Sequence, residues 1–458
     1  MPKKKTALTI EERLQQALVP AEEQPYEVPE NWVWTYISSG FDVTSSKRVH
    51  KSDWLSEGVP FYRTRELVKL SEQGYIDNEL FISEDLYKTF KKEFGVPQKN
   101  DLLISGVGTI GVPYVISDEK KFYFKDGNVI WLKNKGVFDA SYMYYLYKTV
   151  FVDNQIHSMS AGTTVDTYTI INAKNTIIPL PTLSEQQRIV ERIEELFAKL
   201  DEAKERLQEV ADSFAVRKAA ILHKAFTGEL TKQWRRENGV SDESWEEKKL
   251  GEVGVLERGR SKHRPRNDER LFGGIYPFIQ TGDVANADMF IEKHSQTLSD
   301  FGMQQSKLFV KNTICITIAA NIGKVAILSY DSCFPDSVVG LTTDEKNSYK
   351  YVYYYLSTQQ KKLESKAPAT AQKNINLKVL NDLDIPLPTL PEQHEIVRLI
   401  DALLARERAA QQAAEQALAS IDLMKKAILA RAFRGELGTN KASEASALEL
   451  LRQVLAEG

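Results

Sequence analysis

The chain has 458 residues, of which 42% are hydrophobic and 27% are charged, a composition typical of a soluble globular protein with about three domains. Its 60 Lys and Arg against 63 Asp and Glu exclude a protein that binds nucleic acid through net charge alone. No apolar run approaches the ~18 residues of a membrane span, and none follows the basic N-terminus as in a signal peptide. Cys315 and Cys333 form no disulfide framework and no metal motif. We therefore expect a cytoplasmic protein without membrane contact.

The chain begins with a segment that precedes any repeated feature. We expect residues 1–26 to form an N-terminal arm. Thr9 is a suitable cap for a short helix from Ile10 to about Leu18, because its hydroxyl can accept from a free N–H of the first turn.

Residues 27–183 predict a globular domain of short strands and many turns, rich in Tyr, Phe, Ile and Val. Lys and Arg in its turn-like segments can neutralise phosphates, and Arg can pair with guanine. The alternative is solvated loops without a ligand. The candidate DNA-binding residues of this domain are Lys47, Arg48, Lys51, Arg63 and Arg65. Gly106–Gly111 matches G-x-G-x-x-G, but Pro113 and a strand-like run follow it, so a β-turn is favoured over a dinucleotide loop.

Residues 184–228 predict a long helix. Pro179 and Pro181 keep the preceding chain extended, and Thr182 with Glu185 forms a capping-box pair. Apolar residues then alternate at spacings of three and four, which indicates a coiled-coil seam. The predicted seam residues are Ile193, Leu196, Leu200, Leu207, Val210 and Phe214.

This helix and the segment before it are duplicated. Residues 178–230 recur as 385–437 without a gap, and 24 of the 53 aligned positions are identical. The second copy, 391–436, has Ile400 and Leu403 as predicted seam residues. Two repeats in one chain favour a pseudo-two-fold axis, which would make the two helices an antiparallel coiled coil. The alternative is that each helix packs on its own domain. The remaining expected segments are a charged linker, 229–243, and a tail, 437–458, with a short helix from Leu448 to Leu455.

The second domain, 244–390, resembles the first only at landmarks that keep their order. Leu102–Ser105 aligns with Thr313–Ile316, and Gln280 falls where Arg63 stands in the first domain. We expect two pseudo-symmetric α+β domains with one architecture and different loops, separated by the long helices. Arg pairs with guanine, and Asn and Gln pair with adenine. The candidate DNA-binding residues here are Arg260, Lys262, Arg264, Arg266, Gln280, Asn321, Lys324, Lys373 and Asn374.

The search for catalytic residues predicts none, and no metal site is expected. There is no P-loop and no Asp/Asn-Pro-Pro-aromatic methyltransferase motif, and the six histidines lack metal-ligand spacing. Asp336, Asp344 and Lys346 resemble a Mg²⁺-dependent nuclease pattern, so an autonomous nuclease is one alternative. A structural coiled-coil linker without a DNA role is another. The tyrosines at 142–147 and 349–355 are expected to pack short helices on the domain cores.

The repeated P-L-P-x-L-x-E-Q at 179–186 and 386–393, with A-F-x-G-E-L at 225–230 and 432–437, resembles the specificity subunit of type I restriction–modification systems. The resemblance covers nearly the whole chain. It implies a non-catalytic subunit with two target recognition domains, each reading one half of a bipartite, gapped DNA sequence. The conserved helices would set the gap and dock two modification (methyltransferase) subunits, and restriction subunits would join for cleavage.

The resemblance also assigns cofactors to other chains. S-adenosylmethionine, ATP and Mg²⁺ are expected on the partner subunits, and none on this chain. A helix of about 40 residues would be roughly 60 Å long, enough to hold two readers a turn or more of DNA apart.

Overall fold

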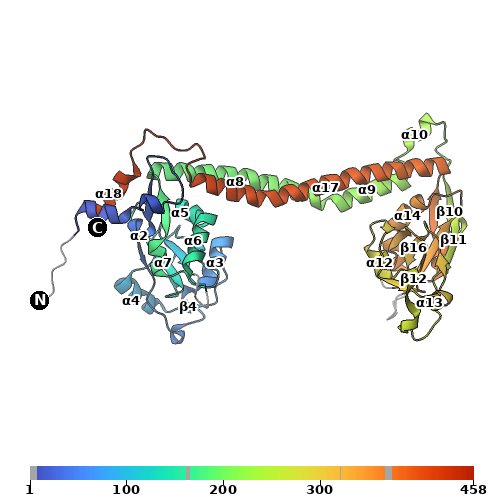
Figure 1. Cartoon of the computed structure of the whole chain (residues 1–458), viewed down its shortest axis with the longest axis horizontal. Coiled ribbons are helices and arrows are strands. Elements are labelled where there is room, and N and C mark those ends of the chain that lie inside the picture. The colour runs from blue at the N-terminus through green and yellow to red at the C-terminus, as the bar shows by residue number, and fades with distance from the viewer. Residues whose placement is uncertain (1–7, 161–165, 320, 367–373, 458) are drawn as a thin grey trace. The chain divides into compact units, whose positions relative to one another are not determined.

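The computed structural model describes residues 8–160, 166–319, 321–366 and 374–457 (Figure 1). The chain divides into two compact units. Unit 1 comprises residues 1–207 and 416–458, and unit 2 comprises residues 208–415. Each unit therefore contains one globular domain, the start of the long helix that follows that domain, and the end of the other long helix. Both units mix helices and sheets, as the α+β prediction requires.

Unit 1 is built around a mainly hydrophobic four-stranded antiparallel sheet with strand order β2-β8-β5-β6. A three-stranded sheet β4-β3-β7 and a pair β1-β9 complete its strands. The strands are β1 (Val33–Tyr36), β2 (Phe41–Thr44), β3 (Val59–Tyr62), β4 (Phe81–Ile82), β5 (Leu102–Ser105), β6 (Pro113–Val115), β7 (Tyr123–Phe124), β8 (Val129–Asn134) and β9 (Ile177–Leu180). The helices are α1 (Ile10–Ala17), α2 (Ile37–Gly40), α3 (Thr64–Gln73), α4 (Glu84–Phe94), α5 (Ala140–Tyr147), α6 (Val150–Ser160), α7 (Ile170–Asn175), α8 (Leu183–Asp212) and α18 (Ala447–Glu457), with 3-10 turns η1 (Ala21–Glu23) and η2 (Lys51–Asp53).

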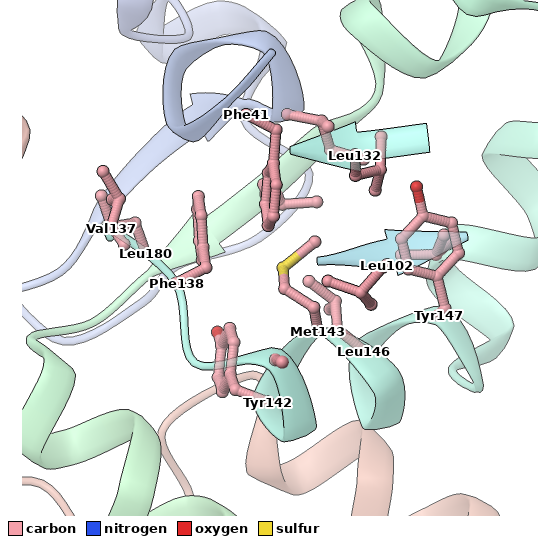
Figure 2. Packing of buried hydrophobic residues seen from close by; sticks show 14 of the residues in the cluster. Phe41, Leu102, Leu132, Val137, Phe138, Tyr142, Met143, Leu146, Tyr147 and Leu180 are labelled. Carbon is pink, nitrogen blue, oxygen red and sulfur yellow. The ribbon is translucent and has the colours of Figure 1, made fainter. Parts of the chain in front are cut away.

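The core of unit 1 lies between this sheet and helix α5. Figure 2 shows Phe41, Leu102 and Leu132 from the strands facing Met143 and Leu146 from α5. All five side chains are buried, which removes a large apolar area from water and holds the helix on the sheet. Tyr142 and Tyr147 of this helix are buried core residues, as predicted, whereas Tyr144 and Tyr145 are half-buried.

Unit 2 repeats this plan with a five-stranded sheet β11-β19-β16-β17-β13, a four-stranded sheet β14-β12-β18-β15 and a pair β10-β20. The strands are β10 (Glu246–Lys249), β11 (Gly254–Arg258), β12 (Phe272–Phe278), β13 (Phe290–Ile291), β14 (Gln296–Leu298), β15 (Leu308–Phe309), β16 (Ile314–Thr317), β17 (Val325–Leu328), β18 (Ser332–Cys333), β19 (Val338–Thr343) and β20 (Asp384–Leu387). The helices are α9 (Phe214–Phe226), α10 (Lys232–Glu237), α11 (Leu250–Val253), α12 (Thr281–Asn286), α13 (Asp300–Gln304), α14 (Tyr349–Thr358), α15 (Gln360–Ser365), α16 (Leu377–Asn381) and α17 (Leu390–Ala432), with a 3-10 turn η3 (Glu269–Leu271).

The predicted alignment of the two central strands is wrong by one residue. Ser105 ends β5 and Thr317 ends β16, and each uses its buried hydroxyl in the same way. Ser105 Oγ accepts from Val112 N at 2.8 Å, and Thr317 Oγ1 accepts from Lys324 N at 3.1 Å. A slip of one residue moves every side chain of a strand to the other face, so the sequence match of two apolar runs could not determine this register.

The first long helix is interrupted, which corrects the prediction of one helix over 184–228. Helix α8 ends at Asp212 and α9 begins at Phe214. Ser213 Oγ donates to Val210 O at 3.1 Å, and Arg217 Nη2 donates to the same carbonyl at 3.0 Å. Val210 is 39% exposed, so it does not lie in a buried seam as predicted. Leu196, Leu200, Leu207 and Phe214 are half-buried.

In unit 1 the start of α8 packs antiparallel to the end of α17 (Figure 1). Ile189 and Ile193 share one cluster with Leu429 and Ala432, and Lys425 forms a 2.6 Å ion pair with Asp201 further along. The same cluster contains core residues of the first domain. Each of the two predicted alternatives is therefore partly right: this helix start packs both on its own domain and on the other long helix.

The corresponding helix pair of unit 2 contains α9 and the start of α17. Ile400 and Leu404 are buried in one cluster with Leu222 of α9, whereas Leu403 is only half-buried. The predicted seam position Leu403 is therefore displaced by one residue to Leu404. The helix turns this face inward because the tyrosines of α14 also pack on it, which a two-helix heptad does not anticipate.

The Glu-Gln pair that begins each long helix is buried and anchors it. Gln186 Nε2 donates to Val137 O and Pro181 O, both at 3.0 Å, and its Oε1 accepts from Asp139 N at 2.7 Å. Gln393 makes the equivalent bonds to Pro388 O, at 2.9 Å, and from Ser348 N, at 2.8 Å. These satisfied buried amides fix the angle at which each helix leaves its domain.

The predicted charged linker, 229–243, is a folded part of unit 2 rather than a spacer. It contains α10, whose Arg235 is buried and forms a 2.7 Å ion pair with the fully buried Glu392. Thr231 Oγ1 donates to the same carboxylate at 2.7 Å. In unit 1 the tail makes the equivalent hydrogen bond, because Thr439 Oγ1 donates to the buried Glu185 at 2.8 Å.

The first and last described helices, α1 and α18, also meet in unit 1. Thr9 and Glu12 form a capping box at the start of α1, and α1 packs against α18. Leu14 and Leu451 are both buried in the main cluster of this unit. The described part of the predicted N-terminal arm, from residue 8 onward, is therefore part of the folded unit.

Candidate nucleic-acid interface

One edge of the main sheet in unit 1 gathers the loops that carry the predicted DNA-binding residues. Strands β2 and β5 end at this edge, and β8 and β6 begin there, since Ser105 pairs with Val129 and Ile104 with Pro113. Loops 45–51, 106–112 and 125–128 therefore lie together. Strand β3 runs parallel to β7, so residues 63–65, which follow β3, lie beside loop 125–128, which follows β7.

Hydroxyl and amide bonds hold these loops to one another. Ser45 Oγ donates to Val129 O and Ser46 Oγ to Phe124 O, each at 2.7 Å. Asn128 O accepts from Thr64 Oγ1 at 3.2 Å and from Gly106 N at 2.8 Å. The edge is thus a rigid surface on which side chains keep defined places, as selective binding requires.

Lys47, Arg48 and Lys51 lie exposed on the loop after β2. Lys47 Nζ stands 5.1 Å from the centre of the Phe94 ring, in cation–π range. Within the part of the chain that the structure describes, none of the three has an acidic partner. Their charge is available to a phosphate.

Arg63 and Arg65 are in a different position, because both contact the buried carboxylate of Glu66. Arg63 Nη2 lies 2.6 Å from Glu66 Oε1, and Arg65 Nε lies 3.0 Å from the same oxygen. Burial by itself would raise the pKa of Glu66, but these donors outweigh it and lower the pKa to about 2. The two guanidinium groups are therefore held in place by a buried carboxylate.

Unit 2 presents the same edge with other residues. Arg258 of β11 pairs with Val339, Thr317 with Val338, and Ile316 with Val325. Residues 259–268, 318–319, 321–324 and 334–337 therefore lie together. Arg260 and Lys262 are exposed and have no acidic partner among the described residues. The hairpin loop between β16 and β17 adds further polar side chains at Asn321 and Lys324.

Arg264, Arg266 and Gln280 have partners within unit 2. Arg264 Nη1 donates to Ser261 O at 2.7 Å, and Arg266 Nη2 lies 3.0 and 2.8 Å from the two carboxylate oxygens of Asp336. Gln280 Nε2 donates to Gln296 Oε1 at 3.0 Å. Asn374 is exposed and forms a backbone bridge with Ala319, and Lys373 lies outside the described residues.

Sequence reasoning missed one basic residue at these edges, Lys125. Lys125 follows β7 directly and its N–H donates to Tyr62 O at 2.9 Å, which places it between residues 63–65 and the loop after β2. The turn sequence Lys-Asp-Gly-Asn between two strand-like runs was the available signal. Arg258, at the end of β11, donates through Nε to the carbonyl of Asp336.

The proposed nuclease pattern is not assembled. Asp336 precedes β19 and Asp344 follows it, and six extended residues separate them by roughly 20 Å, too far to share a metal ion. Asp336 is instead paired with Arg266. Gly106–Gly111 forms the turn of the β5–β6 hairpin, as predicted, and no helix follows it.

Over the described ranges, with their gaps at 161–165, 320 and 367–373, no three His, Cys, Asp or Glu side chains come close enough to hold a metal ion. In the same ranges, no helix has the length and hydropathy needed to cross a bilayer.

The fold defines a protein of two duplicated domains, each of which presents an equivalent polar surface built from loops. The family model described as "Type I restriction modification DNA specificity domain" matches residues 29–212 and again 242–417. The chain belongs to this family of type I restriction–modification specificity subunits.

Several relatives match along most of the chain. The EcoBI specificity subunit of Escherichia coli is 26% identical over 455 residues, which cover 92% of this chain and 90% of that protein. The EcoKI specificity subunit of Escherichia coli strain K12 is 26% identical over 337 residues, covering 69% and 72%. In fold, the chain is similar to the crystal structure of an HsdS subunit from Thermoanaerobacter tengcongensis, with a TM-score of 0.66, 19% identity, and coverage of 90% of this chain and 99% of that one.

Proposed function

We propose that this chain reads one bipartite DNA sequence, with the sheet edge of each unit contacting one half of it. The observation that carries the proposal is the equivalence of the two edges: the same strand ends and hairpin loops present different polar side chains. Exposed Lys and Arg at both edges supply phosphate contacts, which orient the protein, and the amide and guanidinium groups supply base contacts, which discriminate.

The long helices would determine the unread gap between the two halves. Helix α17 has 43 residues, which corresponds to about 65 Å at 1.5 Å per residue. A continuous helix of that length spans nearly two turns of DNA, and its register with α8 and α9 is tied by ion pairs such as Lys425–Asp201 and Arg217–Glu407.

The helices would also dock two modification subunits at equivalent places. Val216 of α9 is 71% exposed, and Leu423, at the matching position of α17, is 67% exposed. Each stands beside a groove between a long helix and a tyrosine-bearing helix, α14 in one unit and α5 in the other. Exposed apolar residues at equivalent positions favour two copies of one partner, because equivalent surfaces can bind the same chain.

The chemistry is assigned to those partners. Methylation with S-adenosylmethionine would be performed by the modification subunits, and ATP- and Mg²⁺-dependent cleavage by restriction subunits. This chain would hold no cofactor of its own, and the complex would act on double-stranded DNA in the cytoplasm.

Exchange of one domain tests the proposal. Residues 27–183 are replaced by the corresponding domain of a relative with another target, and the methylated motif is determined by methylome sequencing of cells that carry the complete system. We expect one half of the motif to change and the other half and the gap to stay. A change in both halves, or in neither, would contradict the assignment of one domain to one half.

A charge variant distinguishes DNA reading from a purely structural role of the chain. Arg260→Ala with Lys262→Ala removes two unpaired charges from the edge of unit 2, whereas Lys232→Ala with Arg236→Ala removes two exposed charges of α10. We expect the first variant alone to weaken DNA binding by the complex and to flatten its salt dependence. Equal binding by both variants would favour the structural role.

A further inference from the structure

Arg63 and Gln280 occupy the same place in the two domains. Each follows the last residues of a strand, β3 or β12, and directly precedes a helix, α3 or α12. The backbone N–H of Arg63 donates to Glu66 Oε2 at 2.9 Å, and that of Gln280 donates to Asp283 Oδ2 at 2.8 Å. The backbone is thus built alike and only the projecting side chain differs.

The Arg63 guanidinium is bound to Glu66 through Nε and one Nη2 hydrogen, which leaves the two terminal nitrogens, Nη1 and Nη2, able to donate to another group. Nε lies 3.0 Å from Glu66 Oε2 and Nη2 lies 2.6 Å from Oε1, so the carboxylate occupies the Nε–H and one Nη2–H. The Glu66 side chain is 3% exposed and that of Arg63 is 30% exposed. Among the described residues nothing accepts from Nη1 or from the second Nη2–H. These two parallel donors match O6 and N7 of guanine in the major groove.

The Gln280 amide is also held by a neighbouring side chain, but it leaves one donor and one acceptor free instead of two donors. One Nε2–H goes to Gln296 Oε1 at 3.0 Å, while the other N–H and Oε1 have no partner in the described part of the chain. One donor beside one acceptor matches N7 and N6 of adenine. In both domains a neighbouring side chain orients the group beforehand, so less side-chain entropy is lost when a base binds.

We propose that Arg63 and Gln280 are the matched base-reading residues of the two domains, with Arg63 contacting a guanine in one half of the target and Gln280 an adenine in the other. This inference rests on the proposed function. It assigns Glu66 and Gln296 as positioning residues that do not touch DNA. Arg65, which also contacts Glu79 at 3.0 Å and is more exposed, is not a base reader in this assignment.

A single-atom change in the DNA tests the Arg63 contact. The target motif is first identified, and 7-deazaguanine, which lacks the N7 acceptor, is then placed at each guanine of the half read by the first domain. For the wild-type chain in complex with its modification subunits, we expect one position at which this base weakens binding about tenfold. The Arg63→Ala complex should bind normal and 7-deaza DNA equally at that position.

Substitution of the reader should change the preferred base. Arg63→Gln is expected to shift the preference at that position from guanine to adenine, and Gln280→Arg to shift one position in the other half from adenine to guanine. Glu66→Gln should reduce discrimination at the Arg63 position only. Arg65→Ala is the matched control, and the 7-deaza effect should persist in it. Unchanged unfolding temperatures of the Arg63→Gln, Gln280→Arg and Arg65→Ala variants exclude misfolding as the cause. Glu66→Gln is measured below its own, lower unfolding temperature, and its unchanged discrimination in the other half of the target is the control.

The inference would be overturned by a half-site without guanine, or by a 7-deaza effect that is equal in wild type and Arg63→Ala at every guanine. If domain exchange still changes one half of the motif, only the assignment of Arg63 fails. If domain exchange changes neither half, the proposed function fails with it.

Discussion

At the scale of single residues, buried polar groups do most to shape this molecule. Glu66 accepts from the backbone of Arg63 and from two guanidinium groups, and so orders the start of α3 and both arginines together. Gln186 and Gln393 bind backbone groups of their own domains and so order the starts of the long helices. Each is costly to bury unless its bonds are made, so each specifies one local arrangement.

The depressed pKa of Glu66 predicts how acid affects the first domain. The pKa is about 2 in the folded chain, below the ordinary value of 4.5, so the stabilisation is complete above about pH 5 and is lost as the pH falls from 5 toward 2. We expect Glu66→Gln to lower the unfolding temperature by several degrees at pH 7 and by less at pH 3. Thermal unfolding followed across this range measures the effect.

The control for this experiment is Glu72→Gln on the same helix, since Glu72 is exposed. Its unfolding temperature should stay close to wild type at every pH. If the wild type and Glu66→Gln lost stability in parallel between pH 5 and pH 3, the ion pairs at Glu66 would not be the source of the stabilisation.

At the scale of elements, the long helices are held by more than a two-helix seam. Ile396, Ile400 and Leu404 face both the second domain and α9, whereas the equivalent face in unit 1 packs on the first domain and the end of α17. The side of the helix that is buried is therefore broader than the two positions per heptad of an isolated coiled coil.

This geometry predicts unequal effects at neighbouring leucines. Leu404→Ala should cost about 2–4 kcal/mol of the free energy of unfolding of unit 2, because it empties a fully packed site. Leu403→Ala, at a half-buried position, should cost about 1 kcal/mol or less. Denaturant unfolding measures both, and a larger loss at Leu403 would restore the seam predicted from the heptad pattern.

At the scale of the whole molecule, the chain is a duplicated unit whose parts are exchanged along the sequence. The end of α17 completes unit 1 and α9 completes unit 2, so each domain contains a piece of the other repeat. The tail binds the buried glutamate at the start of α8, and the folded linker with α10 binds the equivalent glutamate at the start of α17. Each unit therefore takes its long helices from both repeats.

An insertion into the spacer tests whether the helices set the gap of the target. Four residues inserted after Leu207, with four more after Ala414 to keep the helices matched, lengthen each by about 6 Å. We expect the unread gap to grow by about two base pairs, or methylation to be lost. Methylome sequencing identifies either outcome. Retention of the original motif and gap would show that these helices do not set the spacing.

The duplication, the starts of the long helices, the hairpin at Gly106–Gly111 and the core tyrosines were determined by the sequence itself. These features depend on local chemistry: a proline-held approach, a capping box, a turn, or an apolar run. The family was recognisable for the same reason, since its repeated motifs are short and local.

Only the tertiary structure decided which side chains meet. Contacts between elements decided four features that the sequence did not show. They are the alignment of β5 with its counterpart β16, the burial of Leu404 rather than Leu403, the separation of Asp336 from Asp344, and the pairing of Arg63 and Arg65 with Glu66. The sequence pattern of an apolar strand is much the same when the alignment is shifted by one residue. The sequence of a basic loop likewise does not show whether its arginines contact a buried carboxylate. Packing distinguishes these cases, because it alone determines which polar groups leave water together and which remain free to bind another molecule.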